Sequence, residues 1–311
     1  MKKIILCLCF LLGSPGVVLA TKGPTVVVSI KPLHALVAGV MQGVAEPKLL
    51  VTGGGSPHGY ALRPSEARAL AGADLVIWGG PQLEAFLVKP LETLGHKARK
   101  LELLATIEGP LLALRGGGFW EAHGHDAEDG APDNEEHGSA AGVNPHFWLS
   151  PLLAKQLVSH TAQTLSELDP ENQLRYARNA ARLQERLDEL HLQLSQKLAP
   201  IKHVPYVVFH DAYRYFEETY GLNAVGAITL DAERSPGAKR ISEIRDKIKT
   251  LKARCVFSEP QFESRLVETL IAGSGACTGV LDPLGSDLPA GPESYFQLLN
   301  TLADTLLAGL R

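Results

Sequence analysis

DPENQLRYARNAARLQERLDELHLQLSQKL, residues 169–198, is a long segment with one uninterrupted helical pattern. Its apolar residues recur mostly at intervals of three and four positions, the spacing of one helix face. They are Leu174, Tyr176, Ala180, Leu183, Leu187, Leu190, Leu194 and Leu198. The Asp-Pro-Glu at the start is typical of a helix N-terminus. The pattern predicts a helix of about seven turns, about 40 Å long, which could act as a rigid brace across a whole domain.

Short apolar runs rich in Val and Ile alternate with helical patterns on both sides of this helix. Before it, we expect strands at 25–30, 48–51 and 75–78, and helices at 33–42, 64–71, 83–93 and from Pro151. After it, we expect strands at 206–209, 224–227, 255–257 and 278–281, and helices at 211–219, 241–251, 264–272 and 294–310. This alternation is typical of βαβ units in a parallel sheet covered on both faces. The predicted fold class is α/β, with two lobes, each a parallel sheet flanked by helices, joined by one long rigid helix.

The length of the chain, 311 residues, accommodates two domains of roughly 100 to 150 residues each. We expect a signal peptide at 1–20, an N-terminal lobe at 21–165, a linking helix at 166–199 and a C-terminal lobe at 200–311. An acidic, histidine-containing loop at 117–143 belongs to the N-terminal lobe. Two lobes on one helix leave a cleft between them.

The first twenty residues have the parts of a secretory signal peptide. Two lysines precede an apolar run at 4–12, and the segment ends in Val-Leu-Ala, a small-residue pattern typical of a cleavage site. The apolar run is too short to cross a membrane, and no other part of the chain offers about 18 consecutive apolar residues. We therefore expect a mature, secreted and soluble chain that starts at Thr21.

Two cysteines remain in the mature chain, Cys255 and Cys277. Both lie in apolar, strand-like runs that could be neighbours in one sheet. An even number of cysteines in an oxidising compartment favours a disulfide. Two buried free thiols are the alternative.

Three histidines, far apart in the sequence, lie at the ends of predicted strands or the beginnings of predicted helices. His58 follows the turn Gly53-Gly54-Gly55, His146 follows a proline, and His210 ends the first strand of the second lobe. Asp282 ends another strand of that lobe. Loops at strand ends assemble ligand sites in α/β proteins, although each histidine taken alone fits a capping or core role equally well. Their joint placement predicts one metal site with ligands His58, His146, His210 and Asp282.

The type of ligand in this set points to the metal. Three imidazoles with one carboxylate or water suit tetrahedral zinc. Manganese and magnesium prefer more oxygen ligands. The expected ion is therefore Zn²⁺.

Five motifs at distant positions resemble the zinc-binding component of bacterial high-affinity zinc ABC importers, the ZnuA family. They are Ser56-Pro57-His58-Gly59-Tyr60-Ala61-Leu62-Arg63-Pro64-Ser65, Asn144-Pro145-His146-Phe147-Trp148, Phe209-His210-Asp211-Ala212-Tyr213-Arg214-Tyr215-Phe216, Ser235-Pro236-Gly237-Ala238-Lys239-Arg240 and Leu281-Asp282-Pro283-Leu284-Gly285. The resemblance extends from about Val26 to the C-terminus. It implies a periplasmic solute-binding protein, expected as a monomer, that carries zinc as its transported ligand to an inner-membrane ABC permease.

The resemblance also implies a ligand set. The three histidine ligands of the family fall on His58, His146 and His210, and its occasional acidic ligand falls on Asp282. Manganese-binding relatives usually carry Glu where this chain has His210, so the third imidazole favours zinc. Some zinc-binding relatives place Glu directly before the first ligand, but this chain has Pro57 there. Water or Asp282 then completes the coordination shell, and the sequence leaves both open.

Negative charge is concentrated in the expected loop. The formal net charge is −4 for the full chain and −6 without Lys2 and Lys3. Residues 121–136 hold seven carboxylates and no basic residue, interspersed with histidines. Such a composition builds no core, so we expect a weak zinc collector; a solvated loop with incidental histidines is the alternative. The rest of the mature chain is near neutral, without the basic stripe that nucleic-acid binding requires.

Two other functions fit part of the pattern. A zinc hydrolase would also use three histidines and an open position, with Asp282, Asp211 or Glu259 as a general base. However, the chain has no HExxH or comparable helix-borne pair. A manganese or iron receptor is the other alternative, and His210 argues against it. We therefore expect a binding protein and not an enzyme.

Overall fold

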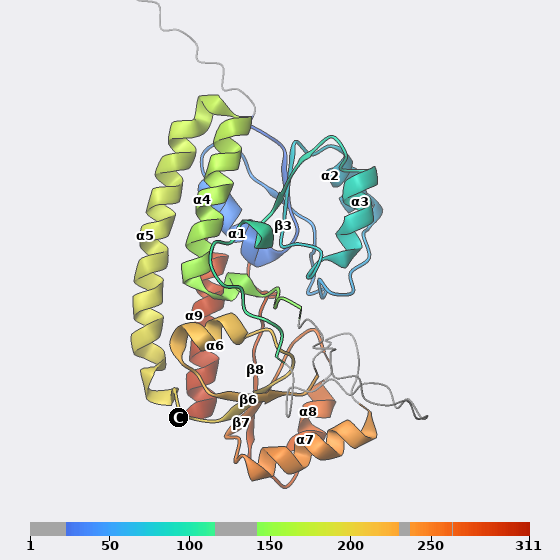
Figure 1. Cartoon of the computed structure of the whole chain (residues 1–311), viewed down its shortest axis with the longest axis vertical. Helices are drawn as coiled ribbons and strands as arrows, with labels where there is room; N and C mark the ends of the chain where they lie inside the picture. The colour runs from blue at the N-terminus through green and yellow to red at the C-terminus, as the bar shows by residue number, and fades with distance from the viewer. Residues whose placement is uncertain (1–22, 116–141, 230–236, 263) are drawn as a thin grey trace, which may run out of the picture.

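The computed structural model describes residues 23–115, 142–229, 237–262 and 264–311. The expected signal peptide and nearly all of the expected acidic loop lie outside the described residues. Figure 1 shows two α/β lobes, one above the other, with long helices along one side. In the described part of the chain, no helix combines the length and the apolarity needed to cross a bilayer.

The first lobe is built on a parallel four-stranded sheet. Its strands are β1 (Val26–Val28), β2 (Lys48–Leu49), β3 (Leu75–Trp78) and β4 (Arg99–Glu102), in the order β2-β1-β3-β4. Its helices are α1 (Lys31–Val40), α2 (Pro64–Ala71) and α3 (Val88–Thr93), the last preceded by a 3-10 turn, η1 (Ala85–Leu87). A further 3-10 turn, η2 (Leu104–Thr106), follows β4. The parallel sheet with helices on both faces confirms the prediction.

The second lobe repeats this plan. Its strands are β5 (Tyr206–Val208), β6 (Ala224–Ala227), β7 (Cys255–Ser258) and β8 (Cys277–Val280), in the order β6-β5-β7-β8. Its helices are α6 (Arg214–Tyr220), α7 (Ala238–Thr250), α8 (Ser264–Ile271) and α9 (Ser294–Leu310). Cys255 and Cys277 are paired residues of neighbouring strands and form a disulfide. The expected bridge is therefore confirmed.

Two long helices lie along one side of the molecule, and one of them reaches both lobes. α4 (Pro151–Leu168) follows the 3-10 turn η4 (Phe147–Leu149), and α5 (Gln173–Leu198) lies between the short turns η5 (Pro170–Asn172) and η6 (Ala199–Ile201). α5 packs against α4 and α1 and, further along, against α6 and α9. Its predicted apolar stripe is buried from Tyr176 to Leu198, but Leu174 is 73% exposed. The division of the chain at 165 and 200 stays a prediction.

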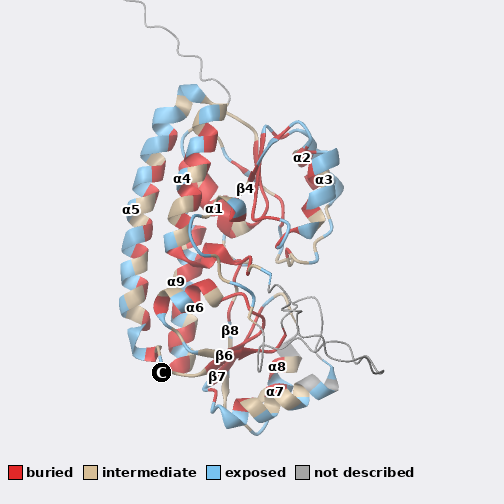
Figure 2. Ribbon diagram, viewed as in Figure 1, coloured by how far each residue is buried: buried red, intermediate tan, exposed pale blue. Residues whose placement is uncertain are grey.

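The apolar core is continuous between the two lobes. Alternate side chains of a strand point to opposite faces of its sheet, so Val26 and Val28 face the long helices while Val27 faces α2 and α3. The same core includes Leu187 of α5 and Tyr206 of β5. Figure 2 shows this buried zone running from the upper sheet through the helices to the lower sheet. The lobes are thus two sheets built around one shared core.

One strand is absent from the sequence-based prediction, and one helix begins later than expected. The sequence pattern does not predict β4, because Arg-Lys-Leu-Glu lacks the apolar run of a central strand. β4 lies at the edge of the sheet, where Arg99 and Lys100 are exposed. The helix expected from Asp211 begins only at Arg214. Asp211 is instead part of the turn between β5 and that helix.

Candidate metal centre

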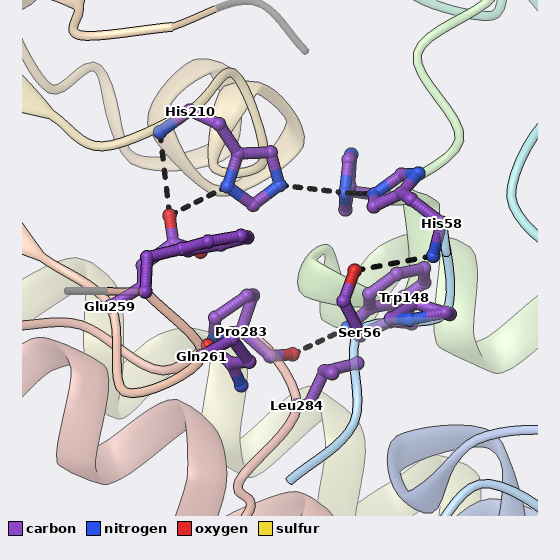
Figure 3. A pocket seen from close by; sticks show the side chains of 11 residues that line it. Ser56, His58, Trp148, His210, Glu259, Gln261, Pro283 and Leu284 are labelled. Carbon is purple, nitrogen blue, oxygen red and sulfur yellow. Dashed lines mark hydrogen bonds and ion pairs between the residues drawn. The ribbon is translucent and has the colours of Figure 1, made fainter. Parts of the chain in front are cut away.

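Three loops bring His58, His146 and His210 together between the lobes. His58 lies in the loop that joins β2 to α2, His146 directly precedes η4, and His210 follows β5. The Nε2 atom of His146 is 3.2 Å from Nε2 of His58 and 3.2 Å from Nε2 of His210. One ligand atom from each ring lies within 4.8 Å of the other two. Figure 3 shows the labelled rings of His58 and His210 on opposite sides of this cluster.

These separations fit one ion. Zinc–nitrogen bonds of about 2.0 to 2.1 Å in a tetrahedron imply nitrogen–nitrogen separations of about 3.3 Å. Two of the observed separations are 3.2 Å. All three donors are imidazole nitrogens, which suit zinc better than calcium or magnesium. The donor set and its spacing therefore match a three-histidine zinc site with room for a fourth ligand.

The electrostatic environment keeps the central imidazole neutral. His146 is only 4% exposed, and burial together with the nearby rings of His210 and His58 holds the pKa of His146 well below its usual value. A neutral imidazole has a lone pair on one nitrogen, and a metal ion requires that lone pair. His146 is thus ready to bind a metal at neutral pH.

Hydrogen bonds determine which nitrogen of two of the rings faces the cluster. The Nδ1 atom of His146 lies 3.0 Å from Oδ1 of Asn144, and Nδ1 of His210 lies 2.7 Å from Oε1 of Glu259. Because both oxygens are acceptors, Nδ1 carries the proton in each ring and Nε2 carries the lone pair. Both Nε2 atoms point into the cluster, as metal binding requires.

The pocket around the cluster has about 270 Å³ of empty space, counting the part open to solvent. Its remaining walls come from both lobes and are largely apolar. They are Ser56, Pro57, Trp148, Glu259, Gln261, Phe262, Pro283 and Leu284. The indole N–H of Trp148 donates to the carbonyl of Pro283 at 2.9 Å, so the wall itself joins the two lobes.

The family "Zinc-uptake complex component A periplasmic" matches residues 26–309.

The chain belongs to this family.

Relatives in the zinc-uptake family match over almost the whole chain. The High-affinity zinc uptake system protein ZnuA of Brucella abortus (strain 2308) is 45% identical, over 98% of this chain and 97% of its own length. The protein of the same name from Yersinia pestis is 37% identical, over 100% of this chain and 98% of its own length. The ZnuA-family resemblance inferred from the motifs is therefore confirmed. Family membership also makes this chain a solute-binding component and not the hydrolase considered above.

Solved structures share the fold of this family member. A structure described as "Crystal structure of ZnuA" superimposes with a TM-score of 0.77 at 24% identity, covering 93% of this chain and 100% of that chain. A "138-173 ZnuA deletion mutant plus zinc bound" gives a TM-score of 0.75 at 24% identity, covering 93% and 98%. At this identity the likeness concerns the fold, two lobes with parallel sheets beside long helices.

The loop that carries His58 turns as the glycines of the sequence predict. Gly53 and Gly54 have φ angles of +71° and +75°, in the left-handed region that glycine adopts without a steric penalty. The backbone N–H of His58 donates to Oγ of Ser56 at 3.3 Å. His58 is half-buried, whereas the other two rings are buried.

The structure does not bring Asp282 together with the three histidines. Its Oδ1 accepts hydrogen bonds from the backbone N–H of Leu284 at 2.9 Å and from Nε2 of Gln261 at 3.0 Å. Its Oδ2 accepts from the backbone N–H of Ser286. Asp282 thus shapes the turn after β8, and its carboxylate oxygens are occupied by that turn and by Gln261. Its role as a fourth ligand stays a prediction.

Two residues that orient the rings have no role in the metal site that the sequence predicts. Asn144 was quoted only within a motif, and Glu259 was considered only as a hydrolase base. A positional signal existed for Glu259, because it follows β7 as His210 follows β5, and these strands are neighbours. The carboxyl ends of neighbouring parallel strands meet at one edge of a sheet.

Asp211 contributes to the site by joining three segments. It is buried and pairs with Arg115, whose Nε donates to Oδ1 of Asp211 at 2.7 Å. The carbonyl of Asp211 accepts from Nδ2 of Asn144 at 2.6 Å. The two segments that flank the expected loop also pair, through an antiparallel bridge between Ala113 and Val143. The base of that loop is therefore bonded to the turn that carries His210.

Proposed function

We propose that this protein captures zinc reversibly at His58, His146 and His210 in the periplasm and passes it to an inner-membrane ABC permease. One observation carries the proposal: three imidazole nitrogens from two lobes converge with the spacing of a tetrahedral zinc site. Family membership supports zinc uptake as the process. The protein acts as a monomer in this proposal, with its N-terminal lobe at 21–165 and its C-terminal lobe at 200–311.

The chemistry of the pocket supports zinc over manganese as the cargo. All three converging donors are nitrogens, and the carboxylate of Asp282 is taken up by its own turn. Manganese prefers several oxygen ligands. We propose a water molecule as the fourth ligand, because the pocket is open to solvent. The acidic loop at 117–143 is proposed as a weak zinc collector, and residues 1–20 as the signal peptide that directs export.

Calorimetry on the mature protein tests the proposal. Wild type should bind one zinc ion tightly, and each of H58A, H146A and H210A should weaken that binding by roughly 100-fold or more. The exposed His96, replaced by alanine, is the matched control and should leave the affinity unchanged. Full-affinity binding by the three site variants would refute the assignment of the ligands.

A growth assay tests delivery to the permease. Bacteria that lack their own periplasmic zinc receptor but keep its permease should grow in the presence of a zinc chelator when they export this protein. The H146A variant, exported to the same level, should fail to support growth. Equal growth with wild type and variant would count against capture at this site as the route of uptake.

A further inference from the structure

Glu259 has an unusual position for a charged residue. It directly follows β7, its exposure is 2%, and it lines the pocket that contains the three histidines. Burying a carboxylate is costly unless a donor compensates it. The donor is His210: Nδ1 lies 2.7 Å from Oε1 of Glu259, and the backbone N–H of His210 lies 3.4 Å from the same oxygen. Sheet geometry produces this contact, because β5 and β7 pair with Tyr206 opposite Cys255.

Asn144 and His146 repeat the arrangement without a charge. Oδ1 of Asn144 accepts from both the backbone N–H and the Nδ1–H of His146, each at 3.0 Å. In both pairs a single oxygen holds the ring and the backbone of one histidine. The difference is chemical, since the acceptor is a neutral amide in one lobe and a carboxylate in the other.

Among the described residues that line the pocket, Glu259 is the only acid. The two other acids near the site are engaged elsewhere. Asp211 is bonded to Arg115, and Asp282 accepts hydrogen bonds from its own turn. Three neutral imidazoles leave both positive charges of a bound zinc ion uncompensated. A carboxylate one ring away offsets part of that charge and increases electron donation by the imidazole.

We propose that Glu259 is the positioning residue that fixes His210 as an Nε2 ligand and supplies the negative charge of the site. Asn144 orients His146 but adds no charge. The effect of Glu259 on affinity rests on the proposed function, whereas its effect on the tautomer of His210 rests on the hydrogen-bond geometry alone. Glu259 acts through His210 and not by contact with the metal.

Nitrogen NMR of ¹⁵N-histidine-labelled apoprotein tests the tautomer. H210A assigns the signals of His210. In wild type, His210 should show a protonated Nδ1 and a bare Nε2. E259Q keeps an acceptor oxygen and should keep this tautomer, whereas E259L removes the acceptor and should give a mixture of the two tautomers. A protonated Nε2 on His210 in the wild-type apoprotein would overturn the proposal, whatever the variants do.

Zinc calorimetry on the same proteins tests the charge. E259Q should weaken zinc binding by roughly 10- to 100-fold, the usual effect of losing such a partner. The exposed Glu268 of α8, replaced by glutamine, is the matched control in the same lobe and should bind as wild type does. E259Q that is folded, keeps the His210 tautomer and binds zinc with wild-type affinity would refute the role of the charge. Wild type that binds no zinc would refute the proposed function instead, and the tautomer measurement would still stand.

Discussion

The two lobes have the same strand order but use their strand ends differently. In the second lobe, His210 lies two residues after the end of β5, and Glu259 directly follows the neighbouring strand β7. In the first lobe, β1 is followed by Lys31 and β3 by the segment that contains Glu84, and neither residue lines the metal pocket. The first lobe contributes His58 and His146 from longer connections. Two sheets with the same strand order therefore contribute different kinds of residues from their strand ends.

The strand ends of the first lobe have a structural task instead. The ammonium group of Lys31 donates to the carbonyls of Gly285, Ser286 and Leu288 in the second lobe, at 2.9, 2.5 and 2.7 Å. Glu84 is buried and accepts from the backbone N–H of Gly80 at 2.9 Å. The second lobe thus uses its strand ends to hold a ligand ring. In the first lobe, Lys31 fastens the two lobes together and Glu84 is bonded within its own lobe.

The largest expected effect on zinc affinity comes from removing a histidine ligand, and one ligand of each lobe is tested in a separate variant. H210A should weaken zinc binding by roughly 1,000-fold, about 4 kcal/mol, because it also removes the Nδ1 donor of the buried carboxylate of Glu259. The loss of zinc affinity in H58A should be roughly tenfold smaller, since His58 is half-buried in a loop without helix or strand. Competition with a chromophoric chelator measures both constants. Equal losses, or a larger loss for H58A, would break the contrast between the lobes.

The buried acid of the first lobe predicts a pH effect on stability. Burial raises the pKa of Glu84 to about 7. Between its ordinary pKa and 7, the folded protein keeps a proton that the unfolded chain releases, so stability falls as pH rises through this window. Glu84→Gln should remove roughly 3 kcal/mol of the decrease in unfolding free energy between pH 5 and pH 8.

Urea unfolding at a series of pH values measures the effect of Glu84. Burial also raises the pKa of Glu217 to about 7, and its contribution cancels because both proteins contain it. The exposed Glu92, replaced by glutamine, is the control and should follow the wild-type profile. A Glu84→Gln profile parallel to wild type would contradict the prediction.

Lys31 tests whether the first lobe really fastens the second. Lys31→Met removes three hydrogen bonds, and among the described residues only the carbonyl of Gly285 keeps a second donor, the backbone N–H of Leu288. Unfolding free energy should therefore fall by about 2 kcal/mol. The exposed Lys48, replaced by methionine, should change it by less than about 0.5 kcal/mol. Thermal and urea unfolding give both values. An unchanged unfolding free energy in Lys31→Met would show that these contacts do not stabilise the packing of the two lobes.

The smallest effect is expected in the loop that carries His58. Gly53→Ala places a side chain at a φ of +71°, which costs about 1 kcal/mol, although nothing lies within 4 Å of the added atom. The strain should weaken zinc binding by a few-fold. Gly72→Ala, at a φ of −103°, is the control and should be neutral. Unchanged affinity and stability in Gly53→Ala would mean that this loop tolerates another backbone conformation.

Apolar periodicity predicted much of this fold because it reports burial. The helix at 64–71, the strand at 75–78 and the buried stripe of α5 appear as expected. Apolar periodicity did not predict β4, because an edge strand needs few apolar side chains. Leu174 is exposed because it lies two positions before the buried Tyr176, a spacing that places it off the buried face of the helix.

The histidine ligands of the candidate site were predictable from the sequence, but the residues that orient their rings were not. His58, His146 and His210 stand beside glycines, prolines or strand ends, which sequence patterns reveal. Asp282 has a similar position, yet its oxygens are used by the turn that it begins. Whether a carboxylate faces a ring or a backbone depends on a few ångströms of tertiary geometry. Local sequence does not encode that distance.

The shared core has a consequence for how a loaded molecule is recognised. Two sheets that meet through α5 and one apolar interior cannot swing apart without exposing that interior to water. Binding an ion should then leave the outline of the molecule nearly unchanged, and small-angle X-ray scattering of the empty and the zinc-loaded protein should superimpose. Under this constraint the proposed membrane permease would distinguish the loaded from the empty protein by the few loops that rim the pocket, and not by a change in overall shape.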